Sequence, residues 1–355
     1  MTDSSPLSIL VFGAGAIGAY VGGTLVTAGQ RVTFVEQPQV AEELCRNGLR
    51  LDLTIDERRK TNEPIAIGPS SFVCVSSLAE AFAHAPFDVA VFAMKSFDTA
   101  AALEGIKPFA EKMPPILCLQ NGVDNEPRLA AALGAGGVIP GTITCSIARR
   151  GPGDIVLEKA RGIGVAAGHP LAERLVAALN AAVLNARLFP DAASMKWSKV
   201  LMNLPGSATS AILDMTPAEV FSRRDLFDLE MGLAREARAV MAAEGARPIN
   251  LPGIPIRLLA SASSLPAFVA RPLMMKAVGG GRGGKMPSFH IDLHAGRKQS
   301  EVEYLHGAVV RHGESAGVPT PVSRLLTETL LAMVRGEIAI AEFSRQPEKL
   351  IRMLG

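Results

Sequence analysis

The sequence predicts two domains: an N-terminal α/β domain with a doubly wound, mainly parallel sheet, and an all-α C-terminal domain. A length of 355 residues suits about two domains. Short apolar runs, each the length of a buried strand, alternate with alanine-rich segments up to about residue 190, and this alternation is typical of parallel sheets covered on both faces. Beyond Pro190 such runs disappear. We therefore expect domains at 1–191 and 192–355.

Composition excludes several classes of partner. The 36 basic and 34 acidic side chains give a net charge of +2, which offers nucleic acid no electrostatic attraction. The four cysteines form no C-x-x-C pair, so we expect neither disulfides nor a zinc cluster, and a cytoplasmic location. The apolar stretch 9–29 is long enough to span a membrane, but it contains five glycines and follows a polar, acidic start. We expect no membrane partner.

The expected elements follow in chain order. Strands are predicted at Ser8–Phe12, Arg31–Val35, Val89–Ala93, Ile116–Leu119 and Val138–Thr144. Helices are predicted at Ser194–Asn203, Pro217–Glu244 and Glu301–Ala316, with a glycine-rich loop at Gly279–Gly284.

A glycine motif lies between the first strand and the helix that follows it. The motif consists of Gly13, Ala14, Gly15, Ala16, Ile17 and Gly18. In such a motif the first glycine permits a tight turn, the second lets the backbone approach a pyrophosphate, and the third packs helix against strand. Within a βαβ unit over residues 8–36, this context predicts a Rossmann domain that binds a dinucleotide.

The second strand ends at Glu36, eighteen positions after Gly18, where a carboxylate would accept hydrogen bonds from the adenosine ribose. A carboxylate there favours NAD, because it repels a 2′-phosphate. Arg31 and Arg46 are close enough in sequence that one of them could compensate. The alternative is a solvated glutamate at a strand end.

The segment from Trp197 to Asn203 places a cation and an amide on one helical face. Lys199 and Asn203 are four residues apart, hence about 40° apart around the helix axis. Ser207 continues this stripe only if the helix passes Pro205, which cannot donate a backbone hydrogen bond and either kinks or ends the helix.

Several motifs in this order make the chain resemble the ketopantoate reductase (2-dehydropantoate 2-reductase) family along nearly its whole length. They are the glycine motif, Lys95 in Phe92–Ser96, Gln120–Val123, Trp197–Asn203, Pro287–Asp292, Gly296–Arg297 and Ser300–Val302. The resemblance implies a Rossmann domain, a helical domain, and NADPH-dependent reduction of a branched 2-oxo acid, ketopantoate to pantoate.

The resemblance also implies roles for individual residues. Lys199 would be the general acid, and Asn203 and Ser288 would bind substrate. Lys95 and Asn121 would line the cofactor, with Asn121 reaching the substrate, and Ile147 would offer the cofactor a backbone contact. Glu301 would close over cofactor and substrate, but it is matched through a gap, so Glu303 is the alternative.

Three departures from the family pattern keep alternatives open. Ser207 and Pro217 stand where the family has asparagines that bind substrate hydroxyls, which allows a different 2-oxo acid. Gln37 stands where an arginine meets the 2′-phosphate, so NAD remains possible although the resemblance implies NADP. A non-catalytic dinucleotide sensor is the alternative from another class.

Two further patterns are set aside. His290 and His294 have a spacing that could share a metal ion, but the sequence offers no obvious third ligand, so no metal is expected. Residues 279–285 match a phosphate-loop pattern without its Ser or Thr. The apolar helical domain is compatible with a homodimer.

Overall fold

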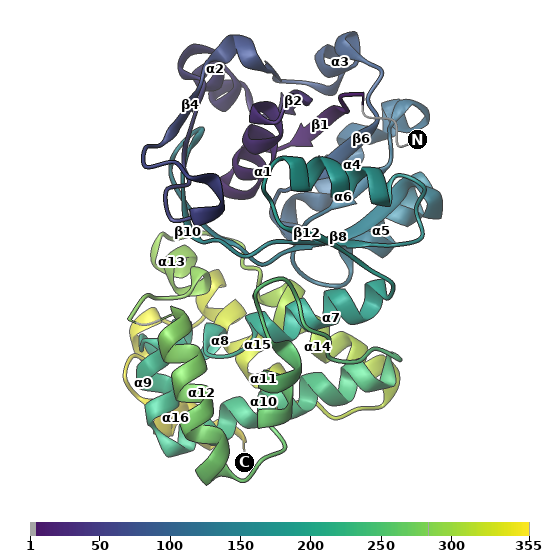
Figure 1. The fold of residues 1–355 in the computed structure, drawn as a ribbon. Coiled ribbons are helices and arrows are strands. Elements are labelled where there is room, and N and C mark those ends of the chain that lie inside the picture. The colour runs from purple at the N-terminus through teal and green to yellow at the C-terminus, as the bar shows by residue number, and fades with distance from the viewer. Residues whose placement is uncertain (1–4, 283, 355) are drawn as a thin grey trace. The chain divides into compact units, whose positions relative to one another are not determined.

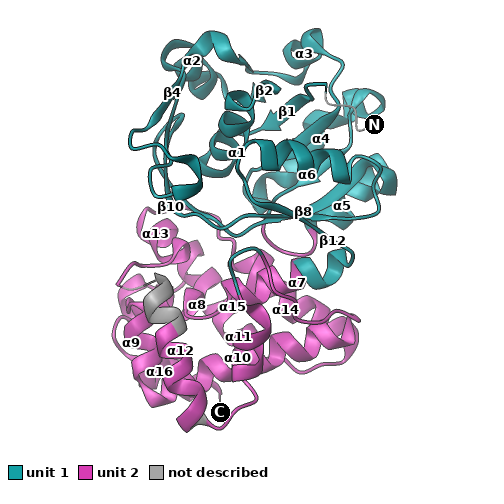
Figure 2. Ribbon diagram, viewed as in Figure 1, with its two compact units in different colours: residues 1–120, 125–195, 252–254 teal, residues 121–124, 196–251, 255–355 magenta. Residues whose placement is uncertain are grey.

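The computed structural model describes residues 5–282 and 284–354, and it divides into two compact units (Figure 2). Unit 1 comprises Met1–Gln120, Asn125–Met195 and Pro252–Ile254. Unit 2 comprises Asn121–Asp124, Lys196–Leu251 and Pro255–Gly355. The division is not a single cut in the sequence, because a four-residue segment after Gln120 packs with unit 2.

An eight-stranded sheet forms the centre of unit 1, in the order β12-β11-β8-β7-β6-β1-β2-β5. Its strands are β1 (Ser8–Phe12), β2 (Arg31–Val35), β5 (Val73–Val75), β6 (Val89–Phe92), β7 (Ile116–Cys118), β8 (Val138–Ile143), β11 (Ile163–Ala166) and β12 (Ala186–Phe189). Every neighbouring pair is parallel except β8 with β11. The mainly parallel sheet and all five predicted strands are thus confirmed.

Both faces of this sheet are buried, as the continuous apolar strands require. Ile9 and Val11 join one apolar cluster, whereas Leu10 and Phe12 join the other. The helices of unit 1 are α1 (Ala16–Thr27), α2 (Pro38–Asn47), α3 (Leu78–Ala81), α4 (Thr99–Ile106), α5 (Asn125–Leu133) and α6 (Ala172–Ala181) (Figure 1).

A second sheet in unit 1 escaped sequence prediction. It has the order β4-β3-β10-β9, with strands β3 (Leu49–Asp52), β4 (Ile65–Ile67), β9 (Ser146–Gly151) and β10 (Asp154–Lys159). Side chains of these strands are partly exposed, and β3, β9 and β10 contain charged residues, so the sheet lacks the apolar runs that marked the central strands.

Helix α1 lies between the two sheets, which explains its apolar, glycine-rich sequence. A Cβ on Gly22 would lie 2.6 Å from the Phe34 ring of β2, and one on Gly23 would lie 2.9 Å from Leu51 of β3. A helix buried on all sides is apolar all round. The stretch 9–29 is therefore a buried strand and helix, and no helix among the described residues is long and apolar enough to cross a membrane.

Unit 2 is helical, as predicted. Its helices are α7 (Ala192–Asn203, shared with the end of unit 1), α8 (Ser207–Leu213), α9 (Pro217–Ser222), α10 (Arg224–Ala243), α11 (Ile256–Ala262), α12 (Ala267–Arg282), α13 (Ser288–His294), α14 (Val302–Ala316), α15 (Pro321–Arg335) and α16 (Pro347–Ile351). Every residue of α8 is buried, and α13 and α15 pack on it.

Two expectations for unit 2 were wrong. The single helix predicted over Pro217–Glu244 is two helices, because Arg223 adopts an extended backbone conformation between them. The predicted glycine loop at Gly279–Gly284 is helical as far as Arg282, while residue 283 lies outside the described residues. Glycine weakens a helix, yet extending one that already exists costs far less than nucleating it.

Candidate active site

The glycine loop of unit 1 adopts a conformation that only glycine tolerates at two positions. Gly13 has φ +86°, and its N–H donates to Val35 O at 3.0 Å. A Cβ on Gly18 would lie 1.8 Å from Gly13 O, so a side chain there would displace the loop.

Gly15 serves a different purpose. It is the N-cap of α1, makes no side-chain capping bond, and a Cβ built on it would meet nothing within 4 Å. The first turn of α1 holds no acidic residue. The space beside Gly15 is therefore open, and the first turn supplies no competing anion, which fits the pyrophosphate of a dinucleotide.

The Glu36 carboxylate is bonded to the glycine loop. Its Oε1 accepts from Ala14 N–H at 2.5 Å, and its Oε2 accepts from Gln37 N–H at 2.9 Å. The acidic group is therefore held at the loop and is not a freely solvated side chain at a strand end.

Neither arginine that could offset this charge lies near it. Arg31 begins β2 whereas Glu36 follows its last residue, a separation of roughly 16 Å along the strand. Arg46 lies in the last turn of α2 and pairs with Glu42 at 2.7 Å. The compensation considered from the sequence is absent in this conformation.

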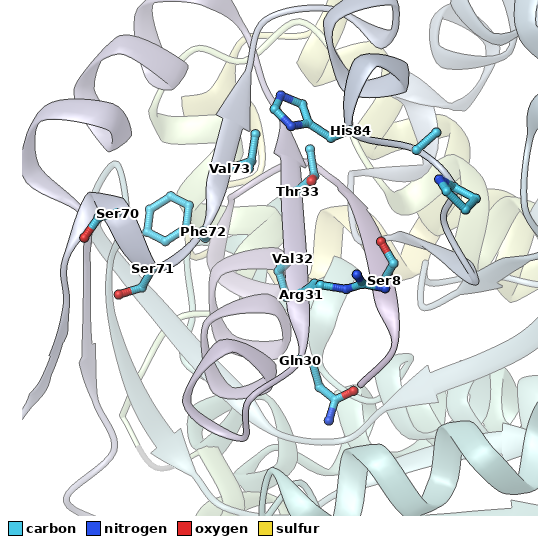
Figure 3. A pocket seen from close by; sticks show the side chains of 12 residues that line it. Ser8, Gln30, Arg31, Val32, Thr33, Ser70, Ser71, Phe72, Val73 and His84 are labelled. Atoms are coloured by element: carbon cyan, nitrogen blue, oxygen red, sulfur yellow. The ribbon is translucent and has the colours of Figure 1, made fainter. Parts of the chain in front are cut away.

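Figure 3 shows where Arg31 lies. Together with Ser8, Val73 and His84 it lines a pocket at the amino-terminal ends of β1, β2 and β5. Dinucleotides bind parallel α/β sheets at the carboxyl ends of the strands. This pocket is therefore at the wrong edge of the sheet for the cofactor.

The opposite edge gathers the predicted cofactor residues. Because β1, β2 and β6 are parallel neighbours, the segments that follow them, which contain Gly13, Glu36 and Lys95, leave the same edge of the sheet. Lys95 is exposed, and the buried Gln120 side chain fixes its turn by donating to Met94 O and Lys95 O, both at 3.3 Å. Gln120 was not predicted to have a role, although a glutamine directly after a buried strand is a signal that could have identified it.

Ile147 lies in β9, opposite Leu157 of β10, and its half-buried side chain packs against the core of unit 1. Its expected backbone contact with the cofactor therefore stays a prediction.

In unit 2, three predicted site residues form a hydrogen-bonded series. Asn203 Nδ2 donates to Asn121 Oδ1 at 3.3 Å, and Asn121 Nδ2 donates to Glu301 Oε1 at 3.3 Å. Glu301 is only 5% exposed, whereas Glu303 is exposed. The geometry therefore favours Glu301 over Glu303.

Lys199 lies one turn before Asn203 on α7. Its side chain is buried, and its Nζ lies 3.9 Å from Met202 Sδ. A lysine in a water-poor setting, one turn from an amide, can act on a developing negative charge more strongly than one in solvent.

The segment that carries Asn121 is fastened to α14. Asp124 accepts hydrogen bonds from Arg311 and from His312, the latter at 2.9 Å. Burial alone would raise the pKa of Asp124, but these bonds lower it to about 2. The bond with Asp124 in turn raises the pKa of His312 against the opposing effect of burial. None of Asp124, Arg311 and His312 was predicted to anchor this segment.

The remaining substrate residues differ in burial. Helix α7 ends at Asn203, so Pro205 marks a helix end and Ser207 does not continue the α7 stripe. Ser207 is buried, donates to Leu204 O, and lies 3.0 Å from His306 Nε2. Ser288 is exposed at the first position of α13.

Family models match most of the chain. The model described as "Ketopantoate reductase PanE/ApbA" matches residues 9–168, and "Ketopantoate reductase PanE/ApbA C terminal" matches residues 191–334. The relatives named 2-dehydropantoate 2-reductase from Halobacterium salinarum and Archaeoglobus fulgidus are both 28% identical to this chain. The alignments cover 91% and 92% of this chain and 97% of each relative.

Solved structures share the fold. A PanE/ApbA family ketopantoate reductase from Ralstonia eutropha has a TM-score of 0.77 at 23% identity, over 93% of this chain and 99% of that one. D-mandelate dehydrogenase in complex with NADH and anilino(oxo)acetate has a TM-score of 0.74 at 20% identity, with the same coverage. With the two models together spanning both units, the chain belongs to the ketopantoate reductase family.

Proposed function

We propose that this chain reduces a branched 2-oxo acid, with ketopantoate as the first candidate, and that Lys199 is the proton donor. Family membership makes it an oxidoreductase that uses a nicotinamide dinucleotide. The observation that carries the assignment of residues is the series Asn203, Asn121 and Glu301 beside the buried Lys199.

The chemistry follows from these groups. A bound reduced nicotinamide supplies a hydride to the ketone carbon. The Lys199 ammonium stabilises the negative charge that develops on the ketone oxygen and donates a proton to it, so the product is a hydroxyl and the lysine regains its proton from water. Asn203 can bind a substrate hydroxyl while Asn121 fixes its amide.

Turnover assays test this proposal. Oxidation of NADH and NADPH is followed with ketopantoate and with a panel of 2-oxo acids. Turnover that Lys199→Ala abolishes supports it. Cofactor binding without turnover of any acid in the panel would instead support a dinucleotide sensor.

A second candidate, a reductase of a different 2-oxo acid, is favoured by Ser207 and Pro217. The Ser207 hydroxyl is engaged by Leu204 O and His306, and Pro217 begins α9 without an N–H or an amide side chain. Neither residue supplies the amide that the family uses to read substrate hydroxyls. A higher kcat/KM for an acid lacking ketopantoate's hydroxyl would favour this candidate.

For the cofactor we propose a preference for NADH, although the resemblance implies NADPH. The Glu36 carboxylate is held at the glycine loop, Gln37 carries no charge, and Arg31 and Arg46 lie elsewhere. A carboxylate there accepts bonds from ribose hydroxyls and repels a 2′-phosphate.

The variant Glu36→Ala/Gln37→Arg tests this preference. Removing one charged hydrogen-bond partner and adding a cation should shift the kcat/KM ratio towards NADPH by about 10-fold or more, since such bonds contribute about 1.5–3 kcal/mol. Gln39→Arg, an exposed position two residues further on, is the control. An unchanged ratio would show that these side chains do not read the phosphate.

A further inference from the structure

Unit 2 contains a cluster of side chains of the types that can bind a metal ion, and the reductase chemistry does not use them. Helix α13 carries His290 and His294 four residues apart, so both project from one face of the helix. Their rings stack with centroids 4.0 Å apart. This pair of histidines was already noticed in the sequence, but no third ligand was obvious there.

The packing of α8 against α13 supplies it. Asp214 caps the C-terminus of α8 in a left-handed conformation, φ +50°, which Asp and Asn tolerate better than other residues with a side chain. Its Oδ1 lies 2.8 Å from His290 Nε2. One carboxylate oxygen and one nitrogen from each histidine lie within 4.8 Å of one another.

We propose that Asp214, His290 and His294 form a binding site for a divalent transition-metal ion, with Zn²⁺ as the ion to test first. Two imidazoles and one carboxylate suit zinc and its neighbours better than Mg²⁺ or Ca²⁺, which prefer oxygen donors throughout. Ligand atoms about 2 Å from a tetrahedral ion are roughly 3.3 Å apart. Because His294 is exposed, its side chain has room to adjust towards that spacing when an ion binds.

An ordinary hydrogen bond explains only part of this cluster. The bond between Asp214 and His290 would be sufficient to join the end of α8 to α13, and His294 adds nothing to that bond. Yet His294 stacks on His290 with a nitrogen turned within reach of the same carboxylate. A shared ion accounts for all three side chains.

A bound ion would join the end of α8 to α13, the helix that begins at Ser288. A bound ion would therefore stabilise the position of α13, which carries the predicted substrate contact Ser288. The site itself does not depend on the reductase activity, so its test needs no turnover.

The test uses the full chain, stripped with a chelator and titrated with ZnCl₂ by calorimetry and by competition with a chromogenic chelator. We expect about one equivalent of Zn²⁺ to bind and to raise the melting temperature, because a ligand that binds only the folded state stabilises it. Asp214→Asn, which keeps tolerance of the left-handed backbone, and His294→Gln, at an exposed position, should each weaken binding by about 10-fold or more.

Two controls make the result specific. His84→Gln removes an exposed histidine of unit 1 and should leave zinc binding unchanged, as should Cys45→Ser, which removes an exposed thiol. Absence of a bound equivalent in the unaltered chain, equal binding by Asp214→Asn and His294→Gln, or loss of binding in Cys45→Ser would overturn the proposal.

Discussion

The two units build their sites in different ways. Unit 1 uses its backbone, because six consecutive residues form the glycine loop. Gly13 is required by its positive φ, and Gly18 is required because a Cβ there would lie 1.8 Å from Gly13 O. Unit 2 uses side chains from Asn121, Asn203 and Glu301, which are far apart in sequence and meet only through the tertiary fold. A backbone site can therefore be read from a short motif, whereas a side-chain site needs the fold.

The largest effect should come from the proton donor of unit 2. Lys199→Ala should lower kcat by about 10²–10⁴-fold, the usual contribution of a positioned acid, while the cofactor Kd measured by fluorescence titration stays unchanged. Lys199→Met keeps a buried, unbranched apolar side chain and should lower kcat to a similar extent. Melting temperatures of both variants separate lost chemistry from lost folding, and near-normal kcat in either folded variant would remove Lys199 from the mechanism.

In unit 1 the contrast lies between two glycines of one loop. Gly18→Ala drives a Cβ into Gly13 O and should lower the free energy of unfolding without cofactor by about 1–3 kcal/mol, the scale of overpacking. Gly15→Ala meets no protein atom, so it should weaken cofactor binding with little loss of stability.

Urea denaturation of the cofactor-free chain, together with cofactor titration, checks both glycine variants. Gly105→Ala, in α4 with open space around it, is the matched control and should stabilise the chain by about 0.5–1 kcal/mol. Equal effects of Gly15→Ala and Gly18→Ala on stability would contradict the division of roles.

The same difference explains what sequence reasoning achieved. Five of the eight strands of the central sheet and the glycine loop were predicted from contiguous patterns, because a strand buried on both faces is apolar throughout. The strands β5, β11 and β12 were not predicted. The second sheet was missed because strands such as β3 alternate buried with exposed positions and contain charged residues.

The side-chain site depended on different information. Asn121 and Glu301 were singled out only through the family resemblance, whereas Asn203 also stood out as an amide one helical turn after Lys199. Asp214 could not be paired with His290, 76 residues away, because helix packing brings them together and no local pattern encodes it.

The anchor of the Asn121 segment gives unit 2 a pH dependence. The bond with Asp124 raises the pKa of His312 in the folded chain above its ordinary value of about 6.5. The protonated His312 therefore stabilises the fold fully below about pH 6.5, and this stabilisation is lost as the pH rises through the pKa of the folded chain. Asp124, with a pKa of about 2, loses its contribution only as the pH falls from about 4 towards 2. Both effects are present between about pH 4 and 6.5.

Trp197 reports this anchor, because it is the only tryptophan in the chain and lies edge-on to His312 at 5.2 Å. Its fluorescence should change with a midpoint above about pH 6.5. His312→Gln should abolish that change and should reduce the free energy of unfolding more at about pH 5.5 than at about pH 8.5.

His306 affects the pH dependence of stability in the opposite direction, because burial lowers its pKa to about 3. The quantity to compare is therefore the difference in unfolding free energy between the variant and the unaltered chain. The same fluorescence midpoint in His312→Gln would rule out this assignment.

The smallest effect concerns the link between Asn203 and Asn121. Asn203→Ala and Asn121→Ala should each lower kcat/KM, and the double variant should lose less than the product of the two, because the second substitution removes a bond that is already broken. A neutral hydrogen bond of this kind contributes about 0.5–1.5 kcal/mol, which is the coupling expected in the double-mutant cycle. Asn121→Ala combined with Glu42→Ala, an exposed residue of unit 1, is the control pair and should be additive. Coupling in the first cycle but not in the control would show that the two amides act together. Additivity within about 0.3 kcal/mol in both cycles would mean that the two amides act on the substrate separately.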